Sequence, residues 1–295
     1  MAMIAFASNS LLCRAALKQT SIDAASFTFI RIFSGAVALW LILMTRRKLI
    51  VRGTALPFVE SSSDPSLVTR HSSLKSGNWI SALALLVYAG AFSFAYNALS
   101  AGTGALLLFG AVQATMILWG FRKGERLRAT QVVGLVAALA GLVVLVSPGL
   151  SAPPLIGSIL MLGAGLAWGV YSLRGKTAGD AVAATTGNFL RAVPFAALVS
   201  VLMLPRMHLD SLGVTYAVIS GAITSGLGYV IWYAALPGLK AASAATVQLS
   251  VPVLAATGGI LLLGEPITLR YMIASIAVLG GIFLVVIEKR QASSV

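Results

Sequence analysis

Apolar residues run along this chain in long blocks, which are separated by short breaks rich in polar residues, glycine and proline. A helix needs roughly 20 apolar residues to cross a hydrocarbon core about 30 Å thick. The pattern predicts an all-α integral membrane protein with ten transmembrane helices. The predicted spans are residues 2–18, 23–45, 79–98, 102–121, 129–147, 154–174, 182–204, 212–236, 241–263 and 270–287.

The first of these blocks is short and carries Arg14, so it invites comparison with a secretory signal peptide. It has neither a basic start nor a convincing cleavage site, and a signal peptide has both. We therefore interpret residues 2–18 as a true span.

Short patterns in the first half of the chain recur in the second half. Phe29–Arg31 recurs as Phe189–Arg191, and Gly124–Leu127 recurs as Gly264–Ile267. The break at Ser147–Pro154 lies between the two copies and marks the midpoint. Internal repeats of this kind in a membrane chain are typical of secondary transporters.

Each half holds five predicted spans, and an odd number requires that the two copies enter the membrane in opposite directions. The prediction is therefore two inverted five-helix repeats. The first covers residues 1–148, with a cytoplasmic loop at 46–77, and the second covers residues 153–290.

The basic residues are consistent with this topology. With the N-terminus inside, most of the 21 lysines and arginines fall on the inner side, as the positive-inside rule requires. Only Lys18, Arg206 and Arg270 fall outside, and three further arginines lie within spans. Both termini are therefore predicted to be cytoplasmic.

Composition excludes several classes of protein. Hydrophobic residues make up 58% of the chain and charged residues 10%, with a mean hydropathy of +0.94, far from a soluble globular composition. The net charge of +13 lies in short loops that face anionic lipid, so the bilayer explains it without a nucleic-acid partner. The single Cys13 allows no disulfide within one chain and no cysteine metal cluster.

Two five-span copies that each end with a Gly-Glu turn before the last helix resemble the drug/metabolite transporter superfamily, in its EamA-like ten-helix branch. The turns at Gly124–Leu127 and Gly264–Ile267 and the segment Ala167–Gly169 carry this resemblance. It implies a secondary carrier, often an exporter of amino acids in the bacterial inner membrane. Within the branch, the chain is most similar to aromatic amino-acid exporters.

All eight acidic residues and both histidines fall in loops or at span ends. An intramembrane enzyme would need such groups in its site, so we expect no enzyme, cofactor or metal. Proton-driven carriers also keep an ionisable group within the membrane. The small multidrug carriers of the superfamily use a glutamate in their first helix, where this chain has Ser8, Asn9 and Ser10. We therefore expect a facilitative exporter.

Aromatic side chains in the third span supply candidate substrate contacts. Tyr88, Phe92 and Tyr96 are spaced four apart and share one helix face. The repeat maps this stripe onto the eighth span, at Ser225, Tyr229 and Tyr233. An aromatic lining for the pathway is one interpretation, and ordinary packing or lipid contact is the other.

Trp168 and Tyr171 lie deeper in the sixth span than an interfacial belt would place them, and they are further candidates for the cavity. Uncharged polar residues within spans could bind the amino and carboxylate groups of an amino acid, or could simply join helices. The candidates of this type are Asn9, Gln113, Asn188 and Gln248. Gln248 is the best of these for binding, because Pro252 removes a backbone hydrogen bond nearby.

Arg31 and Arg191 occupy equivalent repeat positions near the middle of their spans. Each could face a watery cavity, backbone carbonyls or an anionic substrate group, or could reach toward the interface. The fifth and tenth spans instead carry small residues four apart, such as Gly141 and Gly281, which allow close helix contact outside the pathway.

The most specific function predicted is alternating-access export of amino acids, chiefly aromatic and bulky apolar ones. The alternatives are export of other small metabolites or drug-like amphiphiles, and a channel-like pore.

Overall fold

The structure, a computed structural model, describes residues 1–51, 76–122, 124, 129–149, 152–175, 180–235 and 247–292. Every regular element in these ranges is helical, which confirms the predicted all-α class. The elements are α1 (Ala2–Gln19), α2 (Ala24–Val51), α4 (Trp79–Tyr96), α5 (Ala101–Arg122), α6 (Ala129–Val146), α7 (Leu155–Gly175), α8 (Ala181–Leu202), η1 (Leu204–Arg206), α9 (Ser211–Ile219), η2 (Ser220–Leu227), α10 (Gly228–Ala235), α12 (Ser250–Leu263) and α13 (Leu269–Ala292).

Seven helical segments in the described ranges are long and apolar enough to cross a membrane, by length and composition alone. They correspond to α2, α4, α5, α6, α7, α8 and the run from α9 into α10. Two shorter apolar segments lie at Ser250–Leu263 and Leu269–Leu284. The chain is thus a helical protein with several membrane-spanning segments, and the count of ten stays a prediction.

Two predicted elements differ in detail from the structure. The second span was expected to end at residue 45, but α2 continues through Arg46, Arg47 and Lys48 to Val51. Arginine and lysine are good helix formers and are favoured near a helix C-terminus, where the helix dipole is negative. The eighth span was expected to be continuous, but the π-helix η2 separates α9 from α10.

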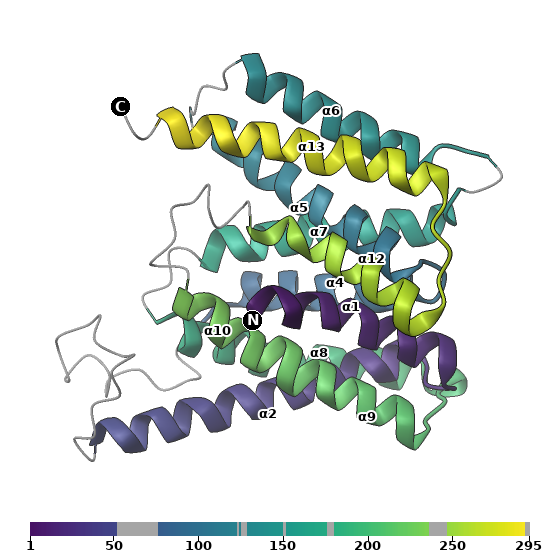
Figure 1. The fold of residues 1–295 in the computed structure, drawn as a ribbon. Helices are drawn as coiled ribbons and strands as arrows, with labels where there is room; N and C mark the ends of the chain where they lie inside the picture. The colour runs from purple at the N-terminus through teal and green to yellow at the C-terminus, as the bar shows by residue number, and fades with distance from the viewer. Residues whose placement is uncertain are drawn as a thin grey trace.

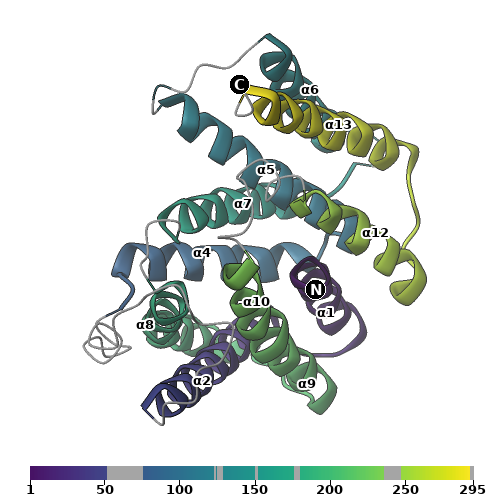
Figure 2. The same cartoon turned by 60° about the vertical axis from the view of Figure 1, so that its left-hand side comes forward.

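The helices pack in a layered bundle (Figures 1 and 2). α6 and α13 lie side by side along one edge, and α5 connects this pair to the rest of the bundle. α7 packs against both α4 and α5, while α2 packs against α8 and η2 on the far side. α1 lies between α12 and the η2 region, so it contacts both sides of the bundle.

Acidic side chains stabilise helix N-termini at the ends of the bundle. Asp180 and Asp210 accept hydrogen bonds from backbone N–H groups in the first turns of α8 and α9. Asp23 does the same at α2 and also accepts from the backbone N–H of His208 at 3.1 Å. This second bond links the connection between α1 and α2 to the connection between η1 and α9. Burial opposes ionisation of Asp23, but hydrogen bonds from Ser26, His208 and Ala25 outweigh it and lower the pKa of this carboxyl.

The contact between α6 and α13 depends on small residues. A Cβ atom added at Gly281 would lie within 3 Å of the backbone at Gly134 and Ala138, and one at Gly141 would lie 2.8 Å from Ala277. The predicted small-residue faces of these two helices therefore meet each other within one chain. Gly280, next in sequence, has open space around its Cβ position.

This pair of glycines gives a direct test of the packing. Gly281→Ala should destabilise the protein by about 1–3 kcal/mol, because its methyl group would press on backbone atoms that have little freedom to move. Gly280→Ala should be neutral or slightly stabilising, since alanine favours helix by up to about 1 kcal/mol. Thermal unfolding of both purified variants in detergent measures this. Equal midpoints would show that α6 and α13 do not pack as described.

Candidate functional site

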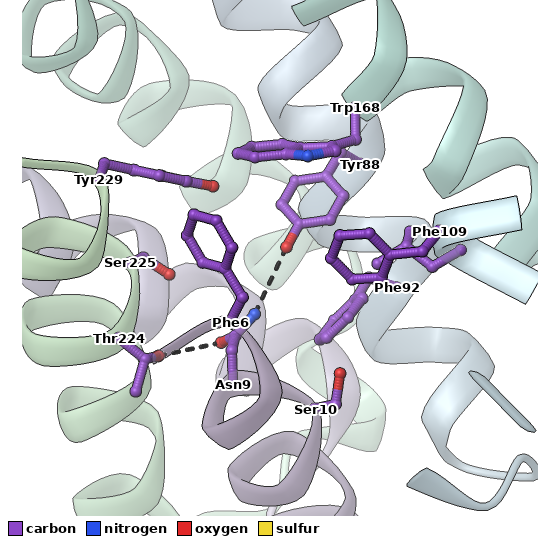
Figure 3. Close-up of a pocket in the computed structure, with 11 residues that line it drawn as sticks. Phe6, Asn9, Ser10, Tyr88, Phe92, Phe109, Trp168, Thr224, Ser225 and Tyr229 are labelled. Atoms are coloured by element: carbon purple, nitrogen blue, oxygen red, sulfur yellow. Dashed lines mark hydrogen bonds between the residues drawn. The ribbon is translucent and has the colours of Figure 1, made fainter. Parts of the chain in front are cut away.

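A small pocket lies in the middle of the bundle (Figure 3). Its walls come from α1, α4, α5, α7, η2 and α10. The lining residues are Phe6, Asn9, Ser10, Tyr88, Phe92, Leu108, Phe109, Trp168, Thr224, Ser225 and Tyr229. Residues from both halves of the chain therefore build one site.

Aromatic rings form one side of the pocket. Trp168 stacks on Tyr229 with ring centroids 5.1 Å apart and planes inclined by 20°. Tyr88 lies 4.8 Å from the Trp168 ring, and Phe6 meets both Trp168 and Tyr229 at a steeper angle. Figure 3 shows these rings gathered around a common space. Such a surface suits an aromatic or bulky apolar group.

A group of hydroxyls around Asn9 forms the polar side. The Oδ1 atom of Asn9 accepts hydrogen bonds from Ser220 at 2.6 Å and Thr224 at 3.3 Å. Its Nδ2 atom donates to the Tyr88 hydroxyl at 3.4 Å. These side chains are buried, so each must find its partners within the protein.

The π-helix η2 supplies three hydroxyls to this region, those of Ser220, Thr224 and Ser225. Its wider turn brings residues about five apart onto the same face, which places Ser220 and Ser225 together, with Thr224 beside them. Short π-helical segments inside α-helices are frequent at functional sites. η2 also lies close to α2, since a Cβ atom added at Gly221 would clash with the backbone oxygen of Arg31.

Arg31 lies directly behind the polar side of the pocket. Its Nη2 atom donates to the Tyr88 hydroxyl at 2.9 Å and its Nε atom to Ser225 at 3.3 Å. The guanidinium also stands over the rings of Tyr88 and Phe92, at 5.2 and 4.9 Å from their centroids. Only 2% of Arg31 is exposed, so it does not reach the interface.

The pocket is closed in this conformation. The space inside is about that of one water molecule. A larger molecule would therefore fit only if helices around the pocket moved apart.

Comparison with known proteins decides the family. The model of the EamA-like transporter family matches residues 155–287. An uncharacterized protein of Pseudomonas aeruginosa is 54% identical to this chain, in an alignment that covers 97% of this chain and 92% of the relative. The uncharacterized transporter YoaV of Bacillus subtilis is 25% identical over 88% of this chain and 85% of its own. The chain belongs to the EamA-like transporter family.

This membership confirms the resemblance to the drug/metabolite transporter superfamily and makes the chain a multi-pass membrane transporter, not an enzyme. The described helices also align with a protein known from its crystal structure. The two share a TM-score of 0.61 at 18% identity, and the alignment covers 98% of this chain and 96% of the other. The fold is therefore shared, and membership of a transporter family implies a small-molecule substrate.

Five of the predicted site residues meet in the pocket of this family member: Asn9, Tyr88, Phe92, Trp168 and Tyr229. They come from four separate helices, so the structure brings together what the sequence kept far apart.

Two further aromatic candidates lie one turn behind the pocket wall. Tyr171 stacks on Trp168 with centroids 5.4 Å apart. Tyr96 packs edge-on against Phe92, and its hydroxyl donates to the backbone oxygen of Ala101 at 3.3 Å. Both are buried, and neither lines the pocket.

The remaining three candidates lie elsewhere or outside the described part. The Oδ1 atom of Asn188 accepts a hydrogen bond from the backbone N–H of Asn78 at 2.9 Å, away from the pocket. Gln248 is half-buried just before a turn at Leu249, one turn before Pro252. The side chain of Tyr233 falls outside the described residues.

Six pocket residues were not predicted as substrate contacts: Phe6, Ser10, Leu108, Phe109, Thr224 and Ser225. Two of them carried a signal in the sequence. Ser225 is the repeat counterpart of Tyr88, and Phe6 lies one turn before Asn9 and Ser10. Leu108 and Phe109 belong to a helix whose residues 104–113 are all buried, so periodicity could not single them out.

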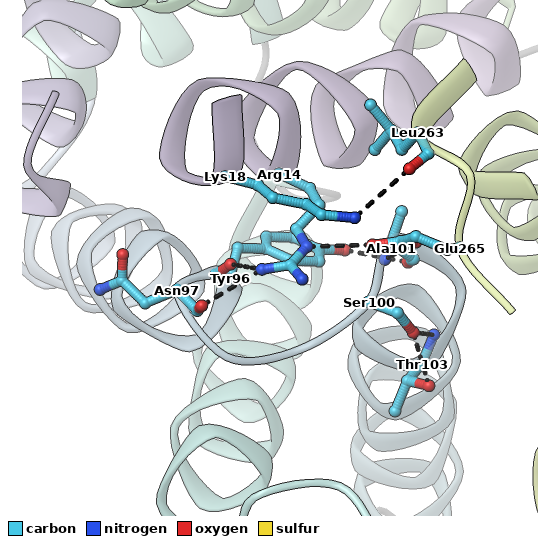
Figure 4. A network of polar contacts seen from close by, with 9 residues as sticks. All are labelled: Arg14, Lys18, Tyr96, Asn97, Ser100, Ala101, Thr103, Leu263 and Glu265. Atoms are coloured by element: carbon cyan, nitrogen blue, oxygen red, sulfur yellow. Dashed lines mark hydrogen bonds and ion pairs between the residues drawn. The ribbon is translucent and has the colours of Figure 1, made fainter. Parts of the chain in front are cut away.

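A second polar group closes the bundle one helical turn beyond the pocket (Figure 4). Arg14 follows the pocket residue Ser10 by one turn of α1. Its Nε atom donates to Glu265 at 3.0 Å, and its Nη1 atom donates to the backbone oxygen of Tyr96 at 2.8 Å. Glu265 also accepts from the backbone N–H of Ala101 at 2.7 Å. This group joins α1, α4, α5 and the turn after α12.

Toward the other end of α4, Arg174 donates to the side chains of Ser81 and Asn78, each at 3.1 Å. Arg14 and Arg174 are equivalent in the predicted repeat. The pocket therefore lies between two arginine-centred groups that hold opposite ends of α4.

The buried pair of Arg14 and Glu265 should contribute strongly to stability. Glu265→Gln leaves Arg14 without its counter-charge, and the loss from breaking a buried pair is about 3–5 kcal/mol. Asp180→Asn is the control, because Asp180 pairs with Arg46 near the surface and asparagine still caps α8. That change should cost less than about 1 kcal/mol. Thermal unfolding in detergent compares the two, and equal losses would contradict the assignment.

Proposed function

We propose that this transporter exports aromatic and bulky apolar amino acids from the bacterial cytoplasm by alternating access. The observation that carries the proposal is the composition of the central pocket. Stacked rings of Trp168, Tyr229 and Tyr88 lie beside the amide of Asn9 and the hydroxyls around it. An apolar side chain fits the first surface, and the polar groups of an amino acid fit the second.

The mechanism proposed rests on two inverted five-helix repeats, at residues 1–148 and 153–290. Let α1, α2, α4, α5 and α6 correspond in order to α7, α8, α9–α10, α12 and α13. The contacts then occur in matching pairs, because α4 packs on α7 as α9–α10 and η2 pack on α1. α5 likewise packs on α7 as α12 packs on α1. Three further contacts join a helix to its own counterpart in the other repeat: α2 with α8, α5 with α12, and α6 with α13.

The repeated Gly-Glu turn supports the same correspondence. Gly124 and Gly264 occupy equivalent repeat positions, and both have positive φ, of 90° and 63°. Residues other than glycine rarely adopt this backbone conformation. α5 and α12, which hold the same place in the two proposed repeats, are thus each followed by a glycine of positive φ.

In this mechanism the pocket opens in turn to each side as the repeats rock against each other. The group around Arg14 would part when the pocket opens at that end, and the group around Arg174 when it opens at the other. Closure of the pocket between both groups corresponds to the occluded step of the cycle.

Transport is proposed to run down the substrate's own gradient. The polar residues that line the pocket are Asn9, Ser10, Tyr88, Thr224 and Ser225, none of which is a carboxylate or an imidazole. A proton carried with the substrate would therefore find no such group to hold it within the pocket.

We place the protein in the bacterial inner membrane with both termini in the cytoplasm. In Figure 1, α1 runs from the middle of the picture to the right and α13 runs back to the left, so the start of α1 and the end of α13 face the same way. The basic C-terminal turn of α2 lies on the left too, which agrees with the positive-inside rule.

Uptake of radiolabelled substrates into liposomes that contain the purified protein tests the proposal. Phenylalanine and tryptophan should show saturable uptake, with threonine and a sugar well below them. Trp168→Ala and Tyr229→Ala should each weaken apparent affinity about tenfold, because a stacked ring pair is worth about 1 kcal/mol beyond its buried area. Trp40→Ala is the matched control, since Trp40 is 43% exposed on α2.

Several results would contradict the proposal. Equal uptake of all four compounds would argue against an aromatic preference, and non-saturable uptake without counterflow would indicate a channel. A steep dependence of accumulation on an imposed pH gradient would show proton coupling. An unchanged affinity in both the Trp168 and Tyr229 variants would place the substrate elsewhere.

A further inference from the structure

Arg31 is a buried positive charge whose hydrogen bonds all lead toward the pocket. Its two side-chain partners, Tyr88 and Ser225, both line the pocket, and they occupy equivalent positions in the proposed repeat. The guanidinium thus contacts one residue from each half of the chain. It stands immediately behind the polar wall.

The third nitrogen of this guanidinium is not satisfied. Nη1 of Arg31 is buried and has no hydrogen-bond partner among the described residues. The two ion pairs within that part of the chain join Arg14 to Glu265 and Arg46 to Asp180, so Arg31 has no carboxylate there. A charge removed from water without a counter-charge is unfavourable, and the rings of Tyr88 and Phe92 offset only part of that loss.

We propose that Arg31 receives the carboxylate of the substrate, so that the transported compounds must carry one anionic group. This inference rests on the proposed function, because it places the carboxylate end of the same substrate. A guanidinium presents a planar fork of donors that matches a carboxylate. A carboxylate at Arg31 would supply both the missing counter-charge and an acceptor for Nη1.

The surroundings favour a single negative charge. Every other polar group that lines the pocket is an uncharged hydroxyl or amide. A phosphate carries up to about two negative charges and is usually bound by several basic groups, which this wall does not offer. Cationic amphiphiles are disfavoured for the opposite reason, since they would place a second positive charge beside Arg31.

The path to Arg31 runs past two hydroxyls. Tyr88 and Ser225 line the pocket, as Figure 3 shows, and both bond to the guanidinium of Arg31, which is not itself part of the lining. A carboxylate reaches Arg31 when these side chains turn aside as the helices open. The aromatic part of the substrate would then lie against Trp168 and Tyr229.

Arg191, the repeat counterpart of Arg31, is placed differently. Its Nη1 atom donates to the backbone oxygens of Ser76 at 2.6 Å and Gly187 at 3.0 Å, and it stands over the Trp79 ring. It does not line or adjoin the pocket wall. It therefore offers a control of the same residue type at the same repeat position.

The test measures ligand-induced thermal stabilisation of the purified full-length protein in detergent. The ligands are matched pairs with and without a carboxylate: phenylalanine with phenylalaninamide, leucine with leucinamide, and 3-phenylpropionate with 3-phenylpropanamide. In the wild-type protein each acid should act at a concentration about tenfold or more below that of its partner, as expected for a charge-assisted hydrogen bond. Arg31→Gln should abolish that preference, Arg31→Lys should retain part of it, and Arg191→Gln should keep it.

Equal responses to acid and partner in the wild-type protein would overturn the proposal, and this comparison does not depend on any variant folding. A preference that survives Arg31→Gln would overturn it too. So would the absence of a response to every acid, or stabilisation by chloride or inorganic phosphate as strong as that by the acids. An intact acid preference with equal stabilisation by phenylalanine, leucine and threonine would refute the preference for aromatic and bulky apolar side chains alone. Preferential binding of aromatic compounds irrespective of the carboxylate would refute the role of Arg31 alone.

Discussion

Within the hydrocarbon core of a membrane no water is available to satisfy a polar group, so every buried donor and acceptor must find a partner inside the protein. In this chain the amide of Asn9 shows how far that constraint reaches. It bonds to Ser220 and Thr224 of η2 and to Tyr88 of α4, while Tyr88 also accepts from Arg31 of α2. Four elements that are distant in sequence are thereby held at one point. The aromatic rings then pack around it.

The same constraint accounts for the partners of Arg14 and Arg174, which lie away from the pocket. Arg14 is neutralised by Glu265 and by backbone oxygens at the end of α4, and Arg174 bonds to side chains at its other end. Both groups join helices from the two halves, so in the proposed mechanism they are the contacts that change when either end opens. The pocket between them keeps uncharged walls. Under the proposed mechanism, stability and the transport cycle therefore depend on the same polar contacts.

Hydropathy alone locates nearly all the helices, because a membrane helix must be apolar over its whole length. The aromatic side of the site was also within reach, since spacing by four places Tyr88 and Phe92 on one face and the repeat carries Phe92 to Tyr229. Tyr96 continues the same stripe, but it lies at the helix end, where its hydroxyl bonds to the start of α5. Phe109, by contrast, could not be predicted from the sequence. Its helix is buried on every side there, so no polar face contrasts with the face that meets the pocket.

The two repeat-equivalent arginines show where internal symmetry stops being informative. Similar neighbours in sequence, Phe29 to Arg31 and Phe189 to Arg191, do not give similar surroundings, because the partners supplied by the other helices differ. Tyr88 provides a long side chain beside Arg31, whereas its counterpart Ser225 is short, and Arg191 turns to backbone oxygens instead. If two inverted halves share the proposed site, it takes one substrate, and two buried guanidinium groups facing it would repel each other. Divergence to a single arginine at the pocket leaves one positive charge to be matched, which is what a substrate with one carboxylate supplies.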